Sequence, residues 1–451
     1  MSIRIISLYF LIFGLSIYAW KNWFKSLCGL ILLMAIVEHG DMPKSMFGIQ
    51  GMNPWNILFG MIFLAWLLNR RREGLAWDMP RNMNILLLLC LGVILIGVFR
   101  AIFDRGYLEG YSTRNLISEE LINTIKWVIP GLLVFDACRT RKRVVAVLVC
   151  LLVMYFLIAV QVIRVMPPQA ALGSDSSIIT HARMKLNEGV GYQATDLSVL
   201  LGGACWGLLA AIPLINKKKY KYAAIIGVCM IAFGQALTGG RAGYLAWGMT
   251  GLILCLLKWR KYIVLAPVVV ILLTVIFPGA TGRMLQGFGQ TDVEGNAAID
   301  EVAVLSGRTL IWPPVIDKIS ESPVIGYGRR AMERTGITQF LFEKYGRGEA
   351  VKHPHNMYFE TLLDNGIIGS LSIFVLWFVN LFYSTKLFIM SNRLCSAVGG
   401  LSLALMLTNL MGGFTGQHYF PLEHTFGIWV ASFLSWRVYF ESNYNKIRLD
   451  I

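Results

Sequence analysis

The chain has 451 residues, of which 56% are hydrophobic and only 15% are charged. Its mean hydropathy of +0.60 excludes a soluble protein of this length, because only lipid can cover so much apolar surface. A net charge of +15 is typical of nucleic-acid binding, but it also fits a membrane protein whose Lys and Arg collect in cytoplasmic loops. We therefore expect the lipid bilayer, and no nucleic acid, as a partner.

Apolar runs long enough to cross a bilayer follow one another along the chain. We count about thirteen, several of them near the lower limit of length. They begin near residues 3, 24, 54, 83, 121, 143, 194, 222, 242, 261, 364, 394 and 424. This pattern predicts an all-α polytopic membrane protein with about 12–13 transmembrane helices.

The loops between these runs alternate between a basic and a less charged kind. The basic set consists of KNWFK, NRRREG, RTRKR, NKKKYK, KWRK and the tail NYNKIR. The positive-inside rule places this set in the cytoplasm. The N-terminus is then expected outside and the C-terminus inside.

The opposite side of the membrane is expected to carry the long insertions, at residues 100–120, 164–193 and 279–356. We divide the chain into transmembrane helices over 1–278, a long periplasmic loop with short helices over 279–356, and C-terminal transmembrane helices over 357–451. In the long loop, the stretch WPPVIDKISESP has amphipathic spacing, which predicts a helix packed on the membrane face. Loops of this length usually have a function.

Two arginines occupy the side with the long loops. Arg241 lies in TGGRAGYLAW between two apolar runs, where an arginine is costly unless it is paired or faces a water-filled cavity. The glycines around it favour a tight turn or a close approach of the backbone to a ligand. Arg308, in LSGRTLIW, is expected to open a helix of the long loop. An interfacial or solvated arginine is the alternative in both places.

Two histidines stand before the next apolar run, in KHPHNMYFETLLDNG. Pro354 suits the first turn of a helix, so we expect His355 in that turn, on the face that carries Tyr358. His353 would precede the helix. Such histidines are more often packed polar residues, but two of them near outward arginines favour a reactive site.

This set of residues suits one kind of chemistry. Arginines bind phosphate oxygens with paired hydrogen bonds and keep their charge when partly buried. A histidine can take a proton from a hydroxyl group near neutral pH. No DxD motif or carboxylate-rich cluster is present on this side, so we expect no metal and no cofactor. The residues indicate displacement of a lipid diphosphate by a hydroxyl, with arginines stabilising the leaving group.

Three motifs together resemble the O-antigen ligase and polymerase superfamily, which are bacterial inner-membrane glycosyltransferases of the GT-C type. They are TGGRAGY after an apolar run, GRxxIW…SPxxGYG in a long loop, and HxHNxxxExLxxxGxxG at a helix start. They occur in the order seen in the family and cover roughly residues 190–370.

The resemblance implies a GT-C-like fold, an undecaprenyl-diphosphate-linked glycan donor used at the periplasmic face, and an inverting, metal-independent transfer. It implies that Arg241 and Arg308 bind the diphosphate and that His355 is the catalytic base. His353 and Asn356 would orient His355. Arg183, in a stretch that resembles the arginine-containing loop of the family, would contact glycan or phosphate.

Several functions share this donor chemistry. A ligase transfers a glycan to lipid A-core, a polymerase of O-antigen or exopolysaccharide extends a lipid-linked chain, and a protein O-oligosaccharyltransferase modifies Ser or Thr. We favour the ligase or polymerase, with the polymerase slightly ahead. A flippase of lipid-linked sugars, without catalysis, is the alternative of another class, but it would need polar residues across the full membrane depth.

Overall fold

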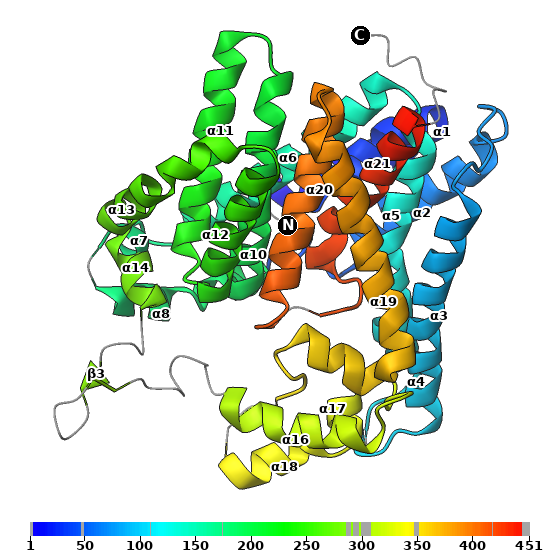
Figure 1. The fold of residues 1–451 in the computed structure, drawn as a ribbon. Coiled ribbons are helices and arrows are strands. Elements are labelled where there is room, and N and C mark those ends of the chain that lie inside the picture. The colour runs from blue at the N-terminus through cyan, green and yellow to red at the C-terminus, as the bar shows by residue number, and fades with distance from the viewer. Residues whose placement is uncertain are drawn as a thin grey trace.

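The computed structural model describes residues 3–46, 49–108, 110–173, 175–285, 290–291, 297–298, 308–346, 351–416 and 418–443. Helices form almost all of the regular structure in these ranges (Figure 1). Two ladders of two residues each pair β1 (Ser45–Met46) with β2 (Ile49–Gln50) and β3 (Gln290–Thr291) with β4 (Ala297–Ala298). The predicted all-α architecture is confirmed.

Seven helices in the described ranges are long and apolar enough to cross a membrane. They are α1 (Ile3–Leu33), α3 (Arg81–Phe103), α6 (Arg141–Val165), α10 (Ala194–Ala211) with η2 (Ile212–Leu214), α11 (Lys218–Leu237), α19 (Met357–Ile389) and α20 (Arg393–Gly412). An eighth span would combine η3 (Arg260–Leu265) and α13 (Ala266–Ile276) with α14 (Pro278–Met284), across a bend of 105°. The protein is therefore a multi-pass membrane protein.

The predicted count of about 12–13 helices is higher than the seven or eight that meet this length. Two predicted runs form the shorter apolar helices α2 (Pro54–Asn69) and α12 (Arg241–Leu257). Two more form α5 (Asn123–Ala137) and α21 (Phe426–Asn443). These four helices have 16, 17, 15 and 18 residues, in agreement with the prediction that several runs lie near the lower limit of length.

The runs predicted near residues 3 and 24 both lie in α1, which is divided at Asn22. The backbone of Asn22 is extended, with φ of −154°, and its side chain accepts a hydrogen bond from the N–H of Lys25. The Ser26 hydroxyl donates to the Leu15 carbonyl at 2.8 Å, 11 residues away. A straight helix would separate these residues by about 16 Å, so the chain reverses at Asn22, inside the predicted basic loop KNWFK.

The centre of the bundle is α10, which packs against α11, α12 and α20. Small residues allow this contact. A side chain at Gly203 would lie 2.6 Å from the Thr408 hydroxyl, and one at Gly207 would lie 2.3 Å from Leu401. Close packing over small residues replaces the hydrophobic effect as the main force between helices in a membrane.

The helices α16 (Arg308–Glu321), α17 (Ala331–Arg334) and α18 (Ile337–Tyr345) lie below the bundle in Figure 1, beside the starts of α4 and α19. We call this side of the molecule the loop end. The predicted helix over WPPVIDKISESP is α16. It packs with α17, α18 and α19 around an apolar cluster of Ile311, Val315, Met332, Leu341 and Leu363.

The remaining short elements are α4 (Thr113–Asn115), η1 (Leu116–Ile122), α7 (Gln169–Leu172), α8 (Ser176–Ala182), α9 (Lys185–Gly189) and η4 (Glu423–Thr425).

A break in α19 joins these loop helices to the bundle. Gly366 has φ of 59° and ψ of −169°, a conformation that residues with a side chain rarely adopt. The segment Pro323–Gly328 lies against the break. It accepts hydrogen bonds from the N–H groups of Ile367 and Ile368, and it donates two to the carbonyls of Leu363 and Asp364. These bonds satisfy the backbone groups that the break would leave unpaired near a membrane surface.

Buried charges hold the same segment. Arg329 is 2% exposed and forms ion pairs with Glu120 and with Asp364, the second at 3.6 Å. The Arg100 guanidinium donates to the carbonyls of Ile325 and Gly326. Removing one partner from such a buried pair costs about 3–5 kcal/mol. The loop is therefore fixed firmly to α3, η1 and α19.

We predict that Gly366→Ala destabilises the protein. The backbone strain alone costs about 1–3 kcal/mol, and a Cβ atom would lie 2.4 Å from the backbone of Val324 and Ile325. Thermal unfolding of the detergent-purified protein should show a lower midpoint. Gly92→Ala on α3 is the matched control, since nothing lies within 4 Å of a Cβ atom there. Equal midpoints for the two variants would contradict the role of the break.

Candidate active site

Arg241 is the first residue of α12, directly after a glycine turn. Gly239 has φ of 67°, and Gly240 is the N-cap residue of the helix. The Ser198 hydroxyl of α10 donates to the Gly240 carbonyl at 2.9 Å, and side chains at Gly240 or Gly243 would collide with Ser198. The predicted glycine turn is therefore present, and it places Arg241 at a helix N-terminus, where the helix dipole favours anions.

Arg308 is the first residue of α16, as predicted. Its Nη2 atom donates to the Thr415 carbonyl, in the loop after α20, at 2.5 Å. Burial lowers the pKa of Arg308, and the positive charge of Arg241 lowers it further. The structure thus brings together two arginines that are 67 positions apart in the sequence, each at the start of a helix.

Two more arginines belong to this group. Arg183 follows α8, and its Nη1 atom lies 3.4 Å from the Gly239 carbonyl. Burial lowers its pKa, and the charge of Arg241 acts in the same direction. Arg283, on α14, is close enough for the charges of Arg183 and Arg241 to act on it. The sequence analysis missed Arg283, although an arginine just after an apolar run is the signal that identified Arg241.

The histidine loop differs from the prediction. We expected His355 in the first helical turn, but α19 begins at Met357. Asn356 is the N-cap residue, and its side-chain oxygen accepts hydrogen bonds from the N–H groups of Tyr358 and Phe359. Because an asparagine competes well for this position, the helix starts after His355. The predicted common face of His355 and Tyr358 is therefore wrong.

His355 has a strained backbone, with φ of 52°. Residues with a side chain rarely adopt this conformation, and it often marks a functional position. The loop helices hold the segment in place: Thr338 of α18 donates to the Val351 carbonyl at 2.8 Å, and Trp312 of α16 donates to the Pro354 carbonyl at 3.1 Å. The strain is thus supported from both sides of the loop.

The rings of His353 and His355 lie 4.1 Å apart between their centroids. Burial lowers the pKa of each ring to about 3, and the Arg308 charge contributes to both shifts. Both rings are therefore neutral at pH 7. A neutral imidazole can accept a proton, which a protonated one cannot.

A third histidine completes the cluster. The ring of His418, in the loop after α20, lies 4.6 Å from that of His353. Its Nδ1 atom lies 2.9 Å from both carboxylate oxygens of Glu360 on α19. The sequence analysis gave neither residue a role. An ionisable residue between two apolar runs, as in GQHYF, is a signal that could have pointed to His418.

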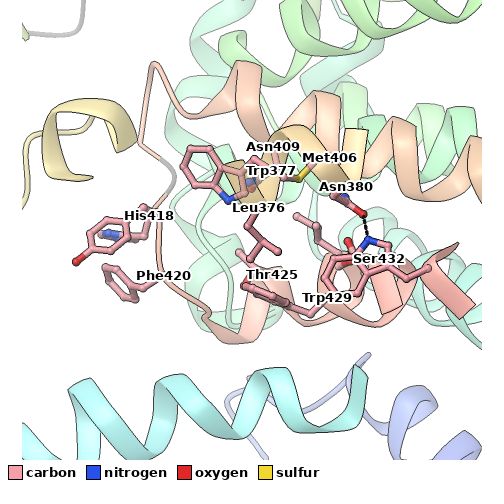
Figure 2. Close-up of a pocket in the computed structure, with 13 residues that line it drawn as sticks. Leu376, Trp377, Asn380, Met406, Asn409, His418, Phe420, Thr425, Trp429 and Ser432 are labelled. Atoms are coloured by element: carbon pink, nitrogen blue, oxygen red, sulfur yellow. Dashed lines mark hydrogen bonds between the residues drawn. The ribbon is translucent and has the colours of Figure 1, made fainter. Parts of the chain in front are cut away.

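A mostly apolar pocket extends from His418 into the bundle (Figure 2). It lies among α19, α20 and α21. Its walls include Trp377, Trp429 and Trp436, and the indole N–H of Trp436 donates to the Asn380 side-chain oxygen at 3.1 Å. Figure 2 shows His418 and Phe420 at one end of the pocket. His418 therefore connects the histidine cluster with this apolar space.

The site as a whole favours an anion beside a proton acceptor. Four half-buried arginines and the N-termini of α12, α16 and α19 direct positive potential to one place at the loop end. The neutral histidines lie next to Arg308. Within the described ranges, no group of three His, Cys, Asp or Glu side chains is arranged to hold a metal ion.

The O-antigen ligase family model matches residues 223–374. This region, about a third of the chain, is similar to the O-antigen ligase family. The matched region contains Arg241, Arg283, Arg308, His353 and His355, the residues that the fold brings together at the loop end.

Two known proteins are similar to part of this chain. The exopolysaccharide production protein ExoQ of Rhizobium meliloti is 28% identical over 178 residues, which are 37% of this chain and 34% of ExoQ. The ComP-specific O-oligosaccharyltransferase of Acinetobacter baylyi is 28% identical over 167 residues, which are 36% of this chain and 29% of that protein. The chain thus matches about a third of the length of each of these relatives.

The lowered pKa values of His353 and His355 lead to a testable prediction. A histidine with a lowered pKa becomes protonated only when the pH falls through that lower value. An ordinary histidine becomes charged near pH 6.5. His353 and His355 should therefore stay neutral down to about pH 4. Diethyl pyrocarbonate reacts with neutral imidazole, and mass spectrometry can follow its reaction at each residue. Relative to a model peptide, both histidines should keep their reactivity at pH 5. A loss with a midpoint near 6.5 would contradict the burial effect.

Proposed function

We propose that the protein is an inverting, metal-independent glycosyltransferase that moves a glycan from undecaprenyl diphosphate to an acceptor hydroxyl. The observation that carries the proposal is the convergence of Arg241 and Arg308, each at a helix N-terminus, beside the neutral and strained His355. Arginine and helix N-termini are the groups that bind phosphate best in proteins. The similarity of residues 223–374 to the O-antigen ligase family agrees with this chemistry.

The residues would act in a single displacement. His355 takes the proton of the acceptor hydroxyl while the oxygen attacks the anomeric carbon. The bond from that carbon to the diphosphate breaks, and its electrons leave with the diphosphate. Arg241 and Arg308, with Arg183 and Arg283 beside them, stabilise the negative charge that develops there. His353 and Asn356 shape the loop that presents His355.

The reaction would take place at the periplasmic face of the bacterial inner membrane. The basic loops that contain NRRREG, RTRKR, NKKKYK and KWRK belong in the cytoplasm by the positive-inside rule. The helix α12, whose first residue is Arg241, runs from the loop end to the basic loop KWRK. The lipid donor would then approach from the outer leaflet.

The acceptor is a growing lipid-linked polysaccharide or lipid A-core, and we favour polymerisation of an exported polysaccharide. The name of ExoQ refers to exopolysaccharide production, which supports this choice. The name of the Acinetobacter baylyi relative refers to O-oligosaccharyl transfer, so a protein acceptor is the second candidate. The donor site is common to all of these reactions.

We predict that Arg241→Ala, Arg308→Ala and His355→Ala each lower turnover by about 100-fold or more, which is the usual effect of removing a charge-stabilising donor or a general base. The purified protein would be incubated in EDTA with lipid-diphosphate-linked glycan and candidate acceptors. Gel analysis would follow donor and product. Arg283→Ala should also reduce turnover, because it shares the same charge cluster.

Arg260→Ala is the matched control, since this arginine is exposed on the opposite side of the bundle and should not affect turnover. Full activity of Arg308→Ala, or loss of wild-type activity in EDTA, would contradict the proposal. A donor that binds but stays intact with every acceptor would instead support the flippase alternative. Longer lipid-linked chains would identify a polymerase, and transfer that requires lipid A-core would identify a ligase.

A further inference from the structure

The proposed reaction leaves a proton in an unfavourable place. Burial, His353 and the Arg308 guanidinium all oppose a positive charge on the His355 ring. A protonated His355 must therefore pass its proton on before the next turnover. The carboxylate of Glu360, which is 8% exposed and contacts His418, could receive it.

The hydrogen bonds define the protonation of His418. When Glu360 is ionised it can only accept hydrogen bonds, and its contact of 2.9 Å with His418 then has the proton of a neutral His418 on Nδ1. The other ring nitrogen, Nε2, then has a lone pair and can accept a proton. A carboxylate behind the ring raises its basicity and fixes its orientation, as in other carboxylate–histidine pairs.

His353 can connect the two ends of the cluster. Its Nδ1 atom faces the backbone N–H of His355 at 3.4 Å, which leaves Nε2 to carry the ring proton. The ring of His353 lies between the other two, with centroid distances of 4.1 Å to His355 and 4.6 Å to His418. A proton received on Nδ1 of His353 and another released from Nε2 would leave the ring neutral.

Other charged groups lie around His418. On the remaining elements packed around this loop, the groups whose charges act on its ring are His424, Glu423, Asp196 and Arg329. Burial lowers the pKa of His418 to about 4. The ring is therefore neutral at pH 7 and available to relay a proton.

We infer that His418 and Glu360 form a carboxylate–imidazole pair that receives, through His353, the proton taken by His355 from the acceptor hydroxyl. The inference rests on the proposed transferase function. The acceptor O–H bond breaks, and the proton moves to His355 and then to Nδ1 of His353, whose hydrogen bond from the His355 backbone N–H breaks as the proton arrives. Nε2 of His353 releases its proton to Nε2 of His418, whose Nδ1 proton moves to Glu360. The carboxylic acid later loses that proton to water, and proton exchange with water returns His353 to its Nε2–H tautomer and His418 to its Nδ1–H tautomer. Both residues act through His355, so they are positioning residues.

The test uses the full-length protein in detergent with the lipid-linked donor. His418→Gly should lower kcat by about 100-fold and leave KM for the donor unchanged, because the arginines still bind the diphosphate. Added imidazole should restore turnover by occupying the space of the missing ring. Purely structural damage would not respond to imidazole, so a variant that stays inactive with imidazole would overturn the inference.

Two further variants keep the test decisive if the glycine variant does not fold. Glu360→Gln and His418→Gln keep a hydrogen-bonding group in place but cannot carry the proton. Each should lower kcat without a change in KM, and a normal kcat in either variant would overturn the inference. His39→Gln is the matched control, because His39 contacts the Asp41 backbone outside this cluster.

The failure of the inference can be distinguished from the failure of the proposed function. If the wild-type protein consumes no donor, or if His355→Ala keeps full turnover, the transferase proposal itself is wrong. If both behave as proposed and the His418 and Glu360 variants are fully active, only the proton path is wrong.

Discussion

The break in α19 at Gly366 is the constraint on which the loop end depends. In an unbroken helix the backbone groups of α19 would bond to one another. At the break they bond instead to the segment Pro323–Gly328. In the chain, α16 precedes this segment and Arg329 follows it directly. Arg329 forms ion pairs with Glu120 and Asp364. The position of Arg308 relative to His355 therefore follows from an irregular piece of backbone that lies where the loop can satisfy it.

The positive charges of the four arginines act on one another. Arg183, Arg241, Arg283 and Arg308 repel one another, and the N-termini of three helices add to the same positive potential. A diphosphate would relieve this repulsion. Its negative charge would also make a proton on His355 less unfavourable, so binding of the donor and basicity of the histidine would increase together.

The sequence predicted those features that depend on local composition. The helix starts at Arg241 and Arg308, the glycine turn before α12 and the helix in WPPVIDKISESP all follow from turn residues and periodicity within a few positions. The start of α19 was predicted wrongly, because the capping strength of Asn356 outweighed the preference of Pro354 for a first turn. Arg283, His418 and Glu360 were missed, because their roles come from contacts between segments far apart in the chain. Gly366 was visible as a glycine in an apolar run, but only the long-range pairing with Pro323–Gly328 explains its conformation.

The most direct test of the account is a structure of the protein with a bound lipid-diphosphate-linked glycan, determined by cryo-electron microscopy in the His355→Ala variant so that the donor stays intact. The account predicts that the diphosphate lies between Arg241 and Arg308, with the anomeric carbon facing the position of the missing imidazole. A diphosphate bound elsewhere, out of reach of both arginines, would contradict it.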